Sequence, residues 1–375
     1  MTATLRTWLP DPKSPELEGA LARLVRTEDV VHVAVMPDAH VAEEVCVGTV
    51  TATRSRLFPA AVGGDIGCGM LSVKLDIPAD TLAERTVAAR VLGGFARAIP
   101  PLLHRAREAP ALPAHLADCP LSSPVLERLK GREGRLGFGT LGRGNHFIEL
   151  EADAEGGLWL LVHSGSRAIG PRIRAHHEAR AARDPTGLAW LEAESAEGQA
   201  YLQDVGWASR YAAANRDALL AGALQVLGEV LSGQGDMSTL LGCDHNHLRR
   251  ECHFGEDLWV HRKGAMALGE GVLGILPGSM GTATVHVEGR GNADALGSSA
   301  HGAGRAMRRG EARKLVPLRR FLREVSGVWF DHRLSEALRE EAPSAYKDLG
   351  QVLRAGRELV RVVRWLRPVL VYKAT

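Results

Sequence analysis

The sequence predicts an α+β fold, because segments with strand-like and helix-like patterns do not alternate regularly along the chain. Of the 375 residues, 45% are hydrophobic and 24% are charged, so the chain can bury a large core. Length alone would suggest about two or three domains. The residues best suited to chemistry, however, are spread from position 65 to position 301, and one site that gathers them would draw on most of the chain. We therefore expect a single domain over residues 1–375.

Strand-like segments lie on both sides of the glycine-rich stretch GGDIGCGM, residues 63–70. Residues 29–38 and 70–76 alternate between apolar and polar positions, which predicts a strand before and a strand after this stretch. We therefore expect the glycine-rich segment to join strands. Residues 158–167 and 256–266 also have the composition of buried strands that end in polar turns.

Helical composition marks residues 80–106 and 208–231, and the second of these segments gives the clearest helix prediction. Between them, residues 108–124 are rich in proline and serine, which predicts an exposed connector. A further helix is predicted over residues 349–367, where apolar residues recur at helical spacing and Pro368 would end the helix.

Positive charge gathers in the last part of the chain. Residues 301–375 hold 17 Lys or Arg and 8 Asp or Glu, a balance of +9, whereas the whole chain carries only +2. This distribution indicates a polyanionic partner. Four arginines of the predicted C-terminal helix would form one basic stripe: Arg354, Arg357, Arg361 and Arg364. A basic stripe of this kind is more often a solvated helix face, and nucleic-acid contact is the alternative.

The composition also bears on the compartment. The five cysteines are scattered and include no C-x-x-C pair, which is typical of a reducing cytosol rather than of a disulfide framework. No apolar run is long enough to cross a bilayer, and the first residues lack the apolar core of a signal peptide. We expect a cytoplasmic protein with no membrane partner.

Asp65 and Cys68 stand three residues apart among four glycines. One interpretation is a turn with a capping aspartate and a small buried cysteine. The other is that both side chains bind one metal ion, provided that the chain supplies more ligands. Histidines in turn-like settings supply such candidates: His146, His163, His245, His247 and His301. Aspartate, cysteine and neutral imidazole are ligand types for transition metals, although a single histidine in a turn is usually structural.

If Asp65, Cys68, His146, His163 and His245 converge, five ligands exceed one tetrahedral site. Because a thiolate can bridge two ions, a two-metal centre is the simplest arrangement. Two neighbouring ions suit phosphoryl chemistry, since they stabilise charge on both the attacking and the leaving oxygen. The cysteine and histidine ligands would suit zinc, but the sequence leaves the metal open.

The chain closely resembles the RtcB family of RNA ligases, which join RNA ends using GTP and manganese. The resemblance covers nearly the whole chain in order. It rests on these blocks: MPDAH (36–40), GGDIGCGM (63–70), GFGTLGRGNHFIEL (137–150), VHSGSRAIG (162–170), DHNHL (244–248), HFGEDLWVHRKGAM (253–266), LPGSMGTA (276–283), SSAHGAGRAMRR (298–309) and APSAYKD (342–348).

The resemblance implies a role for each matched residue. Asp65, Cys68 and His146 would hold one Mn²⁺ ion, and Cys68, His163 and His245 would hold the second, with Cys68 as the bridge. His301 would become guanylylated. The residues implied in cofactor binding are Asn145, His146, Phe147, Ile148, Glu149, His245, Asn246, Pro277, Gly278, Ser279, Met280, Thr284, His301, Gly302, Ala303, Gly304 and Lys373.

The physical chemistry agrees with these roles. A neutral imidazole is a competent nucleophile toward the α-phosphorus of GTP. Gly302 and Gly304 leave room for the backbone to approach a nucleotide, and Lys373 would supply a positive charge to a phosphate. Arg167 is a candidate clamp for an RNA phosphate, and a structural salt bridge is the alternative.

The resemblance implies the reaction and the fold as well. A 2′,3′-cyclic phosphate would be opened to a 3′-phosphate, GMP would be transferred to that phosphate, and a 5′-hydroxyl would then displace GMP. The reaction would serve tRNA splicing or RNA repair, and an archease-type activator is a further partner that the resemblance suggests. The implied fold is a single domain of mostly antiparallel sheets flanked by helices around a dimanganese and GTP site.

Three other functions compete with this one. A phosphoesterase that had lost ligation could dispense with His301 and Lys373, and a non-catalytic RNA-binding protein could dispense with Cys68, but the chain retains all three residues. A purely structural protein would leave the many matched turns unexplained. The sequence therefore favours the ligase.

Overall fold

The computed structural model describes residues 3–10 and 13–374, and its largest element is a seven-stranded sheet. Every neighbouring pair in this sheet is antiparallel. Its edge strands β10 and β14 also lie against each other, so the sheet is strongly curved. The strands in spatial order are β10 (Gly235–Asp244), β5 (Gly69–Pro78), β7 (Gly157–Ser164), β6 (Phe147–Ala152), β17 (Val360–Tyr372), β15 (Thr284–Gly289) and β14 (Leu273–Pro277).

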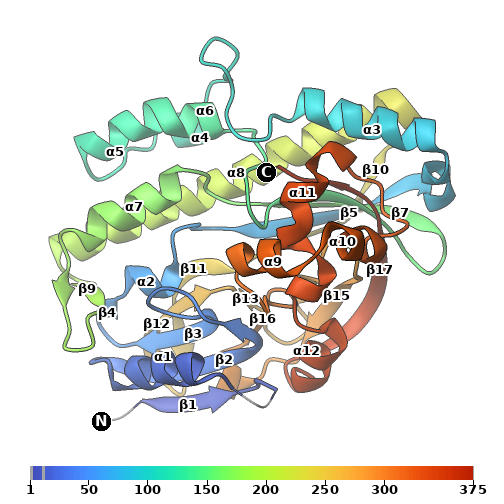
Figure 1. Ribbon diagram of the computed structural model, residues 1–375. Helices are drawn as coiled ribbons and strands as arrows, with labels where there is room; N and C mark the ends of the chain where they lie inside the picture. The colour runs from blue at the N-terminus through green and yellow to red at the C-terminus, as the bar shows by residue number, and fades with distance from the viewer. Residues whose placement is uncertain (1–2, 11–12, 375) are drawn as a thin grey trace.

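A second sheet of five strands lies beside the first (Figure 1). Its order is β1 (Thr4–Thr7), β2 (Val30–His40), β3 (Val47–Thr53), β12 (Glu256–Lys263) and β11 (Asn246–His253). Only β1 and β2 pair in parallel among the described strands. Two small antiparallel sheets join β13 (Ala265–Ala267) to β16 (Ser298–Ala300), and β9 (Ala189–Glu192) to β4 (Arg56–Leu57) and β8 (Ala182–Arg183).

Helices cover the outer faces of both sheets (Figure 1). The main helices are α1 (Pro15–Arg26), α3 (Arg85–Ala98), α7 (Ile169–Glu178), α8 (Ala196–Leu231), α9 (Arg309–Leu315), α10 (Leu318–Glu324) and α12 (Leu349–Ala355). Shorter helices are α2 (Pro59–Val62), α4 (Ala114–Ala117), α5 (Pro124–Leu129), α6 (Arg135–Gly137) and α11 (Ser335–Leu338). Single turns of 3₁₀ or π helix are η1 (Ala79–Ala83), η2 (Lys130–Gly134), η3 (Ala293–Ala295), η4 (His332–Leu334), η5 (Arg339–Glu341) and η6 (Pro343–Ala345).

Two apolar cores hold the layers together. In one, Val91 and Phe95 of α3 and Leu219 of α8 pack on the seven-stranded sheet. In the other, Val50 of the five-stranded sheet packs toward Val285 of the larger sheet, so the two sheets share an interior. The prediction of an α+β fold with mostly antiparallel sheets flanked by helices is thus confirmed, while the single domain over residues 1–375 stays a prediction.

The predicted strands at 29–38, 70–76, 158–167 and 256–266 correspond to β2, β5, β7 and β12. The helix predicted over 208–231 is the second part of α8, which has 36 residues. None of the described helices combines the length and apolar content needed to cross a membrane.

Four local predictions were wrong or only partly right. Residues 80–106 contain α3, but the chain leaves the helix at Ile99. The segment 108–124 is not a purely exposed connector, because it forms α4 and buries Leu116. The glycine-rich loop does not join two strands directly, because the short helix α2 precedes it.

The largest error is the C-terminal helix predicted over 349–367. The helix α12 ends at Ala355, and residues from Val360 onward form the long strand β17. The segment is rich in valine, whose β-branched side chain favours a strand over a helix. Pro368 therefore does not end a helix but lies inside β17, next to a shift in register against β6.

Candidate active site

The glycine-rich loop 63–68 brings two metal-ligand candidates to one end of the seven-stranded sheet. Gly67 has a φ of 69°, and a side chain there would come within 2.8 Å of the Ser209 backbone in α8, so only glycine fits. Gly69 is equally constrained, since a Cβ atom would lie 2.2 Å from the Cys243 carbonyl oxygen. Arg216 of α8 donates from Nη1 to the carbonyl oxygens of Gly67, at 2.6 Å, and Ser164, at 3.1 Å. The long helix thereby fixes the loop against the end of β7.

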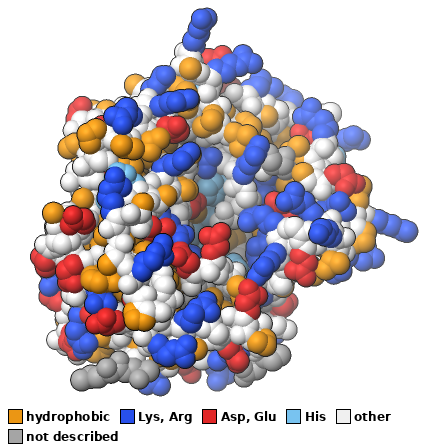
Figure 2. Space-filling view, turned by 60° about the vertical axis from the view of Figure 1, so that its left-hand side comes forward, with side chains coloured by type: hydrophobic (Ala, Val, Ile, Leu, Met, Phe, Trp, Pro, Cys, Tyr) orange, Lys and Arg blue, Asp and Glu red, His pale blue; other side chains and the backbone are white. Residues whose placement is uncertain are grey.

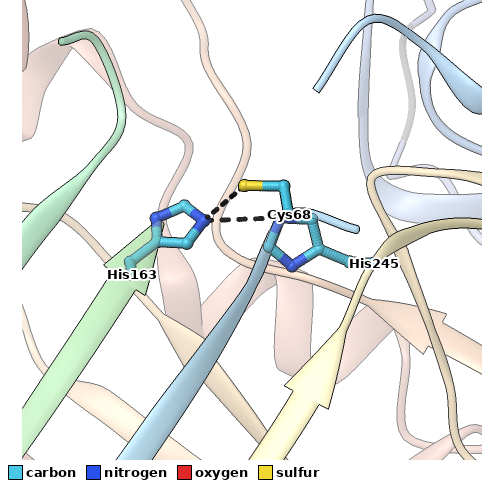
Figure 3. Close-up of side chains that lie close together, drawn as sticks. All are labelled: Cys68, His163 and His245. Atoms are coloured by element: carbon cyan, nitrogen blue, oxygen red, sulfur yellow. Dashed lines mark hydrogen bonds between the residues drawn. The ribbon is translucent and has the colours of Figure 1, made fainter. Parts of the chain in front are cut away.

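The five predicted metal ligands lie together in two groups that share Cys68. One group is Asp65, Cys68 and His146, and the other is Cys68, His163 and His245. Within each group the candidate ligand atoms all lie within 4.8 Å of one another. In the second group, Cys68 Sγ lies 3.3 Å from His163 Nε2, which is 3.4 Å from His245 Nε2 (Figure 3). The three side chains come from separate segments and point toward one another (Figure 3).

The first group has comparable spacing. His146 Nε2 lies 2.8 Å from Asp65 Oδ2 and 3.5 Å from Cys68 Sγ. Asp65 is itself positioned by the backbone N–H of Ser166, which donates to Oδ1 at 3.0 Å. Because one carboxylate, one sulfur and three imidazoles converge, the donor set fits two transition-metal ions that share the sulfur.

Hydrogen bonds to the outer nitrogen orient one of the imidazoles. The distance from His163 Nδ1 to the Asn145 carbonyl oxygen is 2.9 Å, so Nδ1 carries the proton and donates it. This tautomer leaves the Nε2 lone pair directed at Cys68 and His245, which is the arrangement that metal-binding histidines adopt.

Burial sets the protonation of these groups. It lowers the pKa of His163 and of His245 well below the ordinary value, helped by neighbouring histidines, so both are neutral and able to bind a cation. Burial together with the Asp65 carboxylate raises the pKa of the Cys68 thiol well above its usual range. Because the ligand is the thiolate, cation binding has to release the proton of Cys68.

His301 lies at the edge of this centre. Its ring centroid is 4.7 Å from that of His245, and its side chain is 16% exposed. His301 Nδ1 lies 2.7 Å from Asp38 Oδ2, and the backbone N–H of His301 donates to the same oxygen at 3.2 Å. The contact between Nδ1 and Asp38 lacks hydrogen-bond geometry, but Asp38 is fully buried and its carboxylate oxygen is this close to Nδ1. A proton on Nδ1 is therefore the favoured arrangement, and it would leave Nε2 with a free lone pair.

A cavity of about 270 Å³ opens next to His301 and reaches the second ligand group. It is lined by fourteen of the residues predicted to bind the cofactor: Asn145, Phe147, Glu149, His245, Asn246, Pro277, Gly278, Ser279, Met280, His301, Gly302, Ala303, Gly304 and Lys373.

Three predicted cofactor residues lie elsewhere. Ile148 is fully buried in the core against α3 and α8, because strand alternation turns it away from the cavity. Thr284 is buried beside Glu151, whose pKa burial raises to about 7. His146 faces Asp65 and Cys68 and belongs to the metal-ligand group.

A network of buried charges forms the far wall of the cavity. Lys373 Nζ lies 3.2 Å from Glu341 Oε2 and donates to the Gly144 carbonyl oxygen at 3.0 Å. Burial would raise the pKa of Glu341, but Lys373 and two arginines lower it to about 2. Burial raises the pKa of Glu149 well above its usual range, and the neighbouring Glu151 carboxyl raises it further. The cavity is therefore lined by the carboxyl group of Glu149 and by the ammonium group of Lys373, which interact with each other.

Arg167 forms no salt bridge with a carboxylate within the described residues, so the structural alternative for this residue is not supported. Its Nη1 lies 3.3 Å from His146 Nδ1, and its Nε donates to Thr140 Oγ1 at 3.3 Å. Its backbone adopts a φ of 56°, which is uncommon for a residue other than glycine. The guanidinium is thus placed beside the first metal-ligand group.

Two residues of the site escaped the sequence analysis. Asp38 stands in the block MPDAH, but nothing in the block shows that it faces a histidine more than 260 positions further along the chain. Glu341 lies just before the block APSAYKD and has no local signature, because its role depends on the distant Lys373.

Comparisons with known proteins agree with this geometry. The family model described as "tRNA-splicing ligase RtcB" matches residues 20–117 and 117–374. The chain is 34% identical over 373 residues to the RNA-splicing ligase RtcB of Escherichia coli K12, with 91% of this chain and 90% of the relative covered. It is 28% identical over 422 residues to the tRNA-splicing ligase RtcB of Nanoarchaeum equitans, with 92% and 88% covered. Because the family model matches most of the chain, and because the Escherichia coli ligase is 34% identical over 91% of it, the chain belongs to the RtcB family of ligases.

Proposed function

We propose that the protein is a GTP- and manganese-dependent RNA ligase. It would join RNA ends that carry a 2′,3′-cyclic phosphate or a 3′-phosphate to 5′-hydroxyl ends, in tRNA splicing or RNA repair. The observation that carries the proposal is the position of His301, which Asp38 orients at the mouth of a cavity that adjoins two metal-ligand groups. A hydrolase that acts through its metal ions alone has no need of such an oriented imidazole.

Two Mn²⁺ ions fit the donor set, one held by Asp65, Cys68 and His146 and the other by Cys68, His163 and His245. When bound, the ions would supply positive charge that neutralises the phosphates of the nucleotide and the RNA. The chain's own contribution is to keep the imidazoles neutral by burial and to hold His163 in the tautomer that frees its Nε2.

His301 would act as the nucleophile of the first step. Its Nε2 attacks the α-phosphorus of GTP, a nitrogen–phosphorus bond forms, and the bond to the bridging oxygen breaks so that pyrophosphate leaves. Asp38 keeps the proton on Nδ1 and stabilises the positive charge that the ring acquires.

Glu149 and Lys373 would select the base. The hydrogen-bonding edge of guanine offers one carbonyl acceptor and N–H donors side by side, which matches an ammonium group next to a carboxyl group whose oxygens can accept those N–H groups. Adenine presents an amino donor where guanine has the carbonyl, so the lysine would be left without an acceptor. Because Glu341 already pairs with Lys373, a role in base recognition suits this lysine better than a phosphate contact.

The RNA steps would follow at the same phosphorus-binding centre. An oxygen of the RNA 3′-phosphate attacks the phosphorus of the histidine-bound GMP, and His301 leaves. The oxygen of the 5′-hydroxyl then attacks the RNA 3′-phosphorus, and GMP departs as the new phosphodiester bond forms. A 2′,3′-cyclic end is first opened by water to the 3′-phosphate.

The test is to incubate the protein with Mn²⁺ and GTP labelled at the α-phosphate and to look for acid-labile label on the protein. We expect label on the wild type and none on His301→Ala, because only that imidazole meets the oriented geometry. His115→Ala is the matched control, since His115 is exposed and does not line the cavity. An unlabelled wild type, or label that persists in His301→Ala, would contradict the proposal. GTP compared with ATP tests the base selection.

The proposed location is the cytoplasm, which the five unpaired cysteines support. An archease-type activator stays a proposed partner, and addition of such a protein to the labelling assay is the direct way to test it.

A further inference from the structure

A second and larger cavity, of about 840 Å³, adjoins the nucleotide cavity. We call it the outer groove. Four residues line both spaces, namely His40, Val47, Arg305 and Arg309, so the two are continuous. The remaining walls come from the segment before α1, the N-terminal part of α1, and the residues around Arg308 and α12. An extended chain that lies in the outer groove would therefore bring one of its ends to His301.

The outer groove is basic. Five lysines or arginines line it, against two glutamates, and these are Lys13, Arg305, Arg308, Arg309 and Lys347. In Figure 2 many Lys and Arg side chains surround a hollow in which histidine side chains are visible. A groove of this sign, open to solvent and continuous with a phosphoryl-transfer site, fits a polyanionic chain.

The inner and outer arginines of this groove differ in their partners. Arg305 Nη1 and Arg309 Nε both lie 3.4 Å from Glu341 Oε1, so these two arginines pair with a carboxylate that lines the nucleotide cavity. Arg308 is 71% exposed and forms an ion pair with Glu16 at 2.5 Å, which connects the N-terminus of α1 to the residue before α9. An exposed pair of this kind stabilises little, so a phosphate group can replace Glu16 as the partner of Arg308.

We infer that the outer groove binds the phosphodiester backbone of a single-stranded RNA segment that leads to the reaction centre, and that Glu16 competes with the RNA for Arg308. The inference rests on the proposed function, because it takes RNA as the substrate. It assigns one binding path and one competing carboxylate, which the ligase proposal alone does not contain.

The competition makes a prediction that a structural ion pair does not share. Arg308→Gln removes a phosphate contact, so RNA binding weakens by about three- to tenfold and the slope of log K against log salt concentration falls by about 0.7 to 1. Glu16→Gln removes the competitor and a negative charge, so RNA binding strengthens by about two- to threefold. General electrostatics would also shift the two variants in opposite directions, so the deciding comparison is the double variant. If Glu16 competes with RNA for Arg308, Glu16→Gln strengthens binding in the wild type but has no effect once Arg308 is replaced by Gln.

The measurement is the binding of a fluorescently labelled, short single-stranded RNA to the full chain at several salt concentrations. One arm uses an RNA with a 5′-hydroxyl and no terminal phosphate, and the other uses an RNA with a 3′-phosphate. The RNA whose affinity changes more between the variants and the wild type shows which RNA end the outer groove binds. The control is the exposed ion pair between Arg54 and Glu256, at 2.8 Å, which lines neither cavity.

Opposite shifts in the two variants, with no effect of Glu16→Gln once Arg308 is replaced and no shift in Arg54→Gln and Glu256→Gln, are the expected result. Shifts of the same sign, or unchanged affinity in both variants while the wild type binds RNA, would overturn the inference and leave the outer groove to a protein partner. An equal effect of Glu16→Gln with and without Arg308 would also overturn it, because that effect would reflect general electrostatics. Labelling of the wild type by GTP tests the proposed function separately. If the wild type is labelled by GTP but the Arg308 and Glu16 variants bind RNA with unchanged affinity, only the inference about the outer groove is refuted and the proposed function stands.

Discussion

In the proposed reaction, Asp38 is the residue on which the reactivity of His301 would depend most directly. It is fully buried, and one of its oxygens lies against both the backbone N–H and the Nδ1 atom of His301. A carboxylate in this position fixes the tautomer of the ring and favours the charged ring that forms during attack. An asparagine amide in this place carries no negative charge, so it could not also stabilise the charged ring.

We expect Asp38→Asn to lower the rate of guanylylation by roughly 10²- to 10⁴-fold. The binding of Mn²⁺ should persist, because Asp38 belongs to neither metal-ligand group. Single-turnover labelling with GTP and calorimetric titration with Mn²⁺ measure the two effects separately. Asp331→Asn, at an exposed turn that pairs with Arg333, is the control. Equal loss of labelling and of metal binding would show a structural role instead.

The sequence was most informative about residues whose chemistry is local. Asp65 and Cys68 stand out because an acid and a thiol among glycines are unusual, and each histidine stands in its own polar turn. Asp38 could not be found in this way, since an aspartate inside an apolar strand shows its purpose only when its distant partner is known. Ile148 and Thr284 were assigned by resemblance alone. Strand alternation turns Ile148 into the core, and Thr284 is buried beside Glu151 and does not line the cavity.

Among the elements, β17 has the largest influence on the site, because it carries Lys373 at its end and lies between β6 and β15. A helix and a strand bury different residues from the same sequence. In the predicted helix, Val363 and Leu366 share one apolar stripe, whereas in β17 Leu366 is 1% exposed and Val363 is 40% exposed.

This difference gives a test of the element. Leu366→Ala should lower the free energy of unfolding by about 2–5 kcal/mol, since it leaves a cavity in the core. Val363→Ala should cost less than about 1 kcal/mol, because the side chain lies largely in solvent. Chemical denaturation followed by circular dichroism measures both. Similar costs at the two positions would favour the helix.

The C-terminal helix was predicted because apolar residues recur there at helical spacing, and the arginines, at intervals of 3, 4 and 3, imitate a second helical face. In the structure these arginines have no common face, because Arg354 lies in α12, Arg357 precedes β17, and only the other two belong to the strand. Arg361 pairs with Glu288 at 2.6 Å, and Arg364 lies over the Trp159 ring at 4.3 Å. Charge periodicity is a weak guide to an element, since long charged side chains reach partners from many backbone positions, whereas the β-branched valines carry the stronger signal.

At the scale of the whole molecule, the buried charges around Glu341 connect segments that are far apart in the sequence. Glu341 contacts Lys373, Arg305 and Arg309 while only 5% of its side chain is exposed. Such a network is stable only while the carboxyl group is ionised, because a neutral acid would leave three buried or half-buried cations without compensation.

The stability of the protein should therefore depend on pH through this carboxyl group. Its pKa is about 2 in the folded protein against 4.5 ordinarily, so its contribution is complete above about pH 4.5 and is lost as the pH falls toward 2. At pH 7 we expect Glu341→Gln to lower the free energy of unfolding by about 3 kcal/mol, the order that such a shift implies. The difference in the free energy of unfolding between the variant and the wild type should become smaller below pH 4.5.

Denaturant titrations at pH 7, 4 and 3 measure this gap. Glu336→Gln is the control, because Glu336 pairs with Arg339 at the surface with 68% of its side chain exposed. A gap that stays constant between pH 7 and pH 3 would show that ionisation of Glu341 does not contribute.

The fold class and the identity of four strands could be read from the sequence, since alternation and composition are local properties. The order of the strands could not. The sheet places β17 beside β6 and β5 beside β10, pairings that span more than 160 positions and leave no periodic trace in the sequence. The residue types suggested two metal ions that share Cys68, and the division of the candidate ligands into two groups was expected from the family resemblance, which covers every block that contributes to them.

The placement of β17 inside the seven-stranded sheet also constrains how the protein is made. The ribosome releases this strand only after the six others, yet it occupies an interior position between β6 and β15. Those two neighbours cannot complete their pairing until β17 has been synthesised, and Lys373 follows directly after it. The nascent chain must therefore hold an open sheet until translation has passed this strand, and the cavity that Lys373 lines is complete only then.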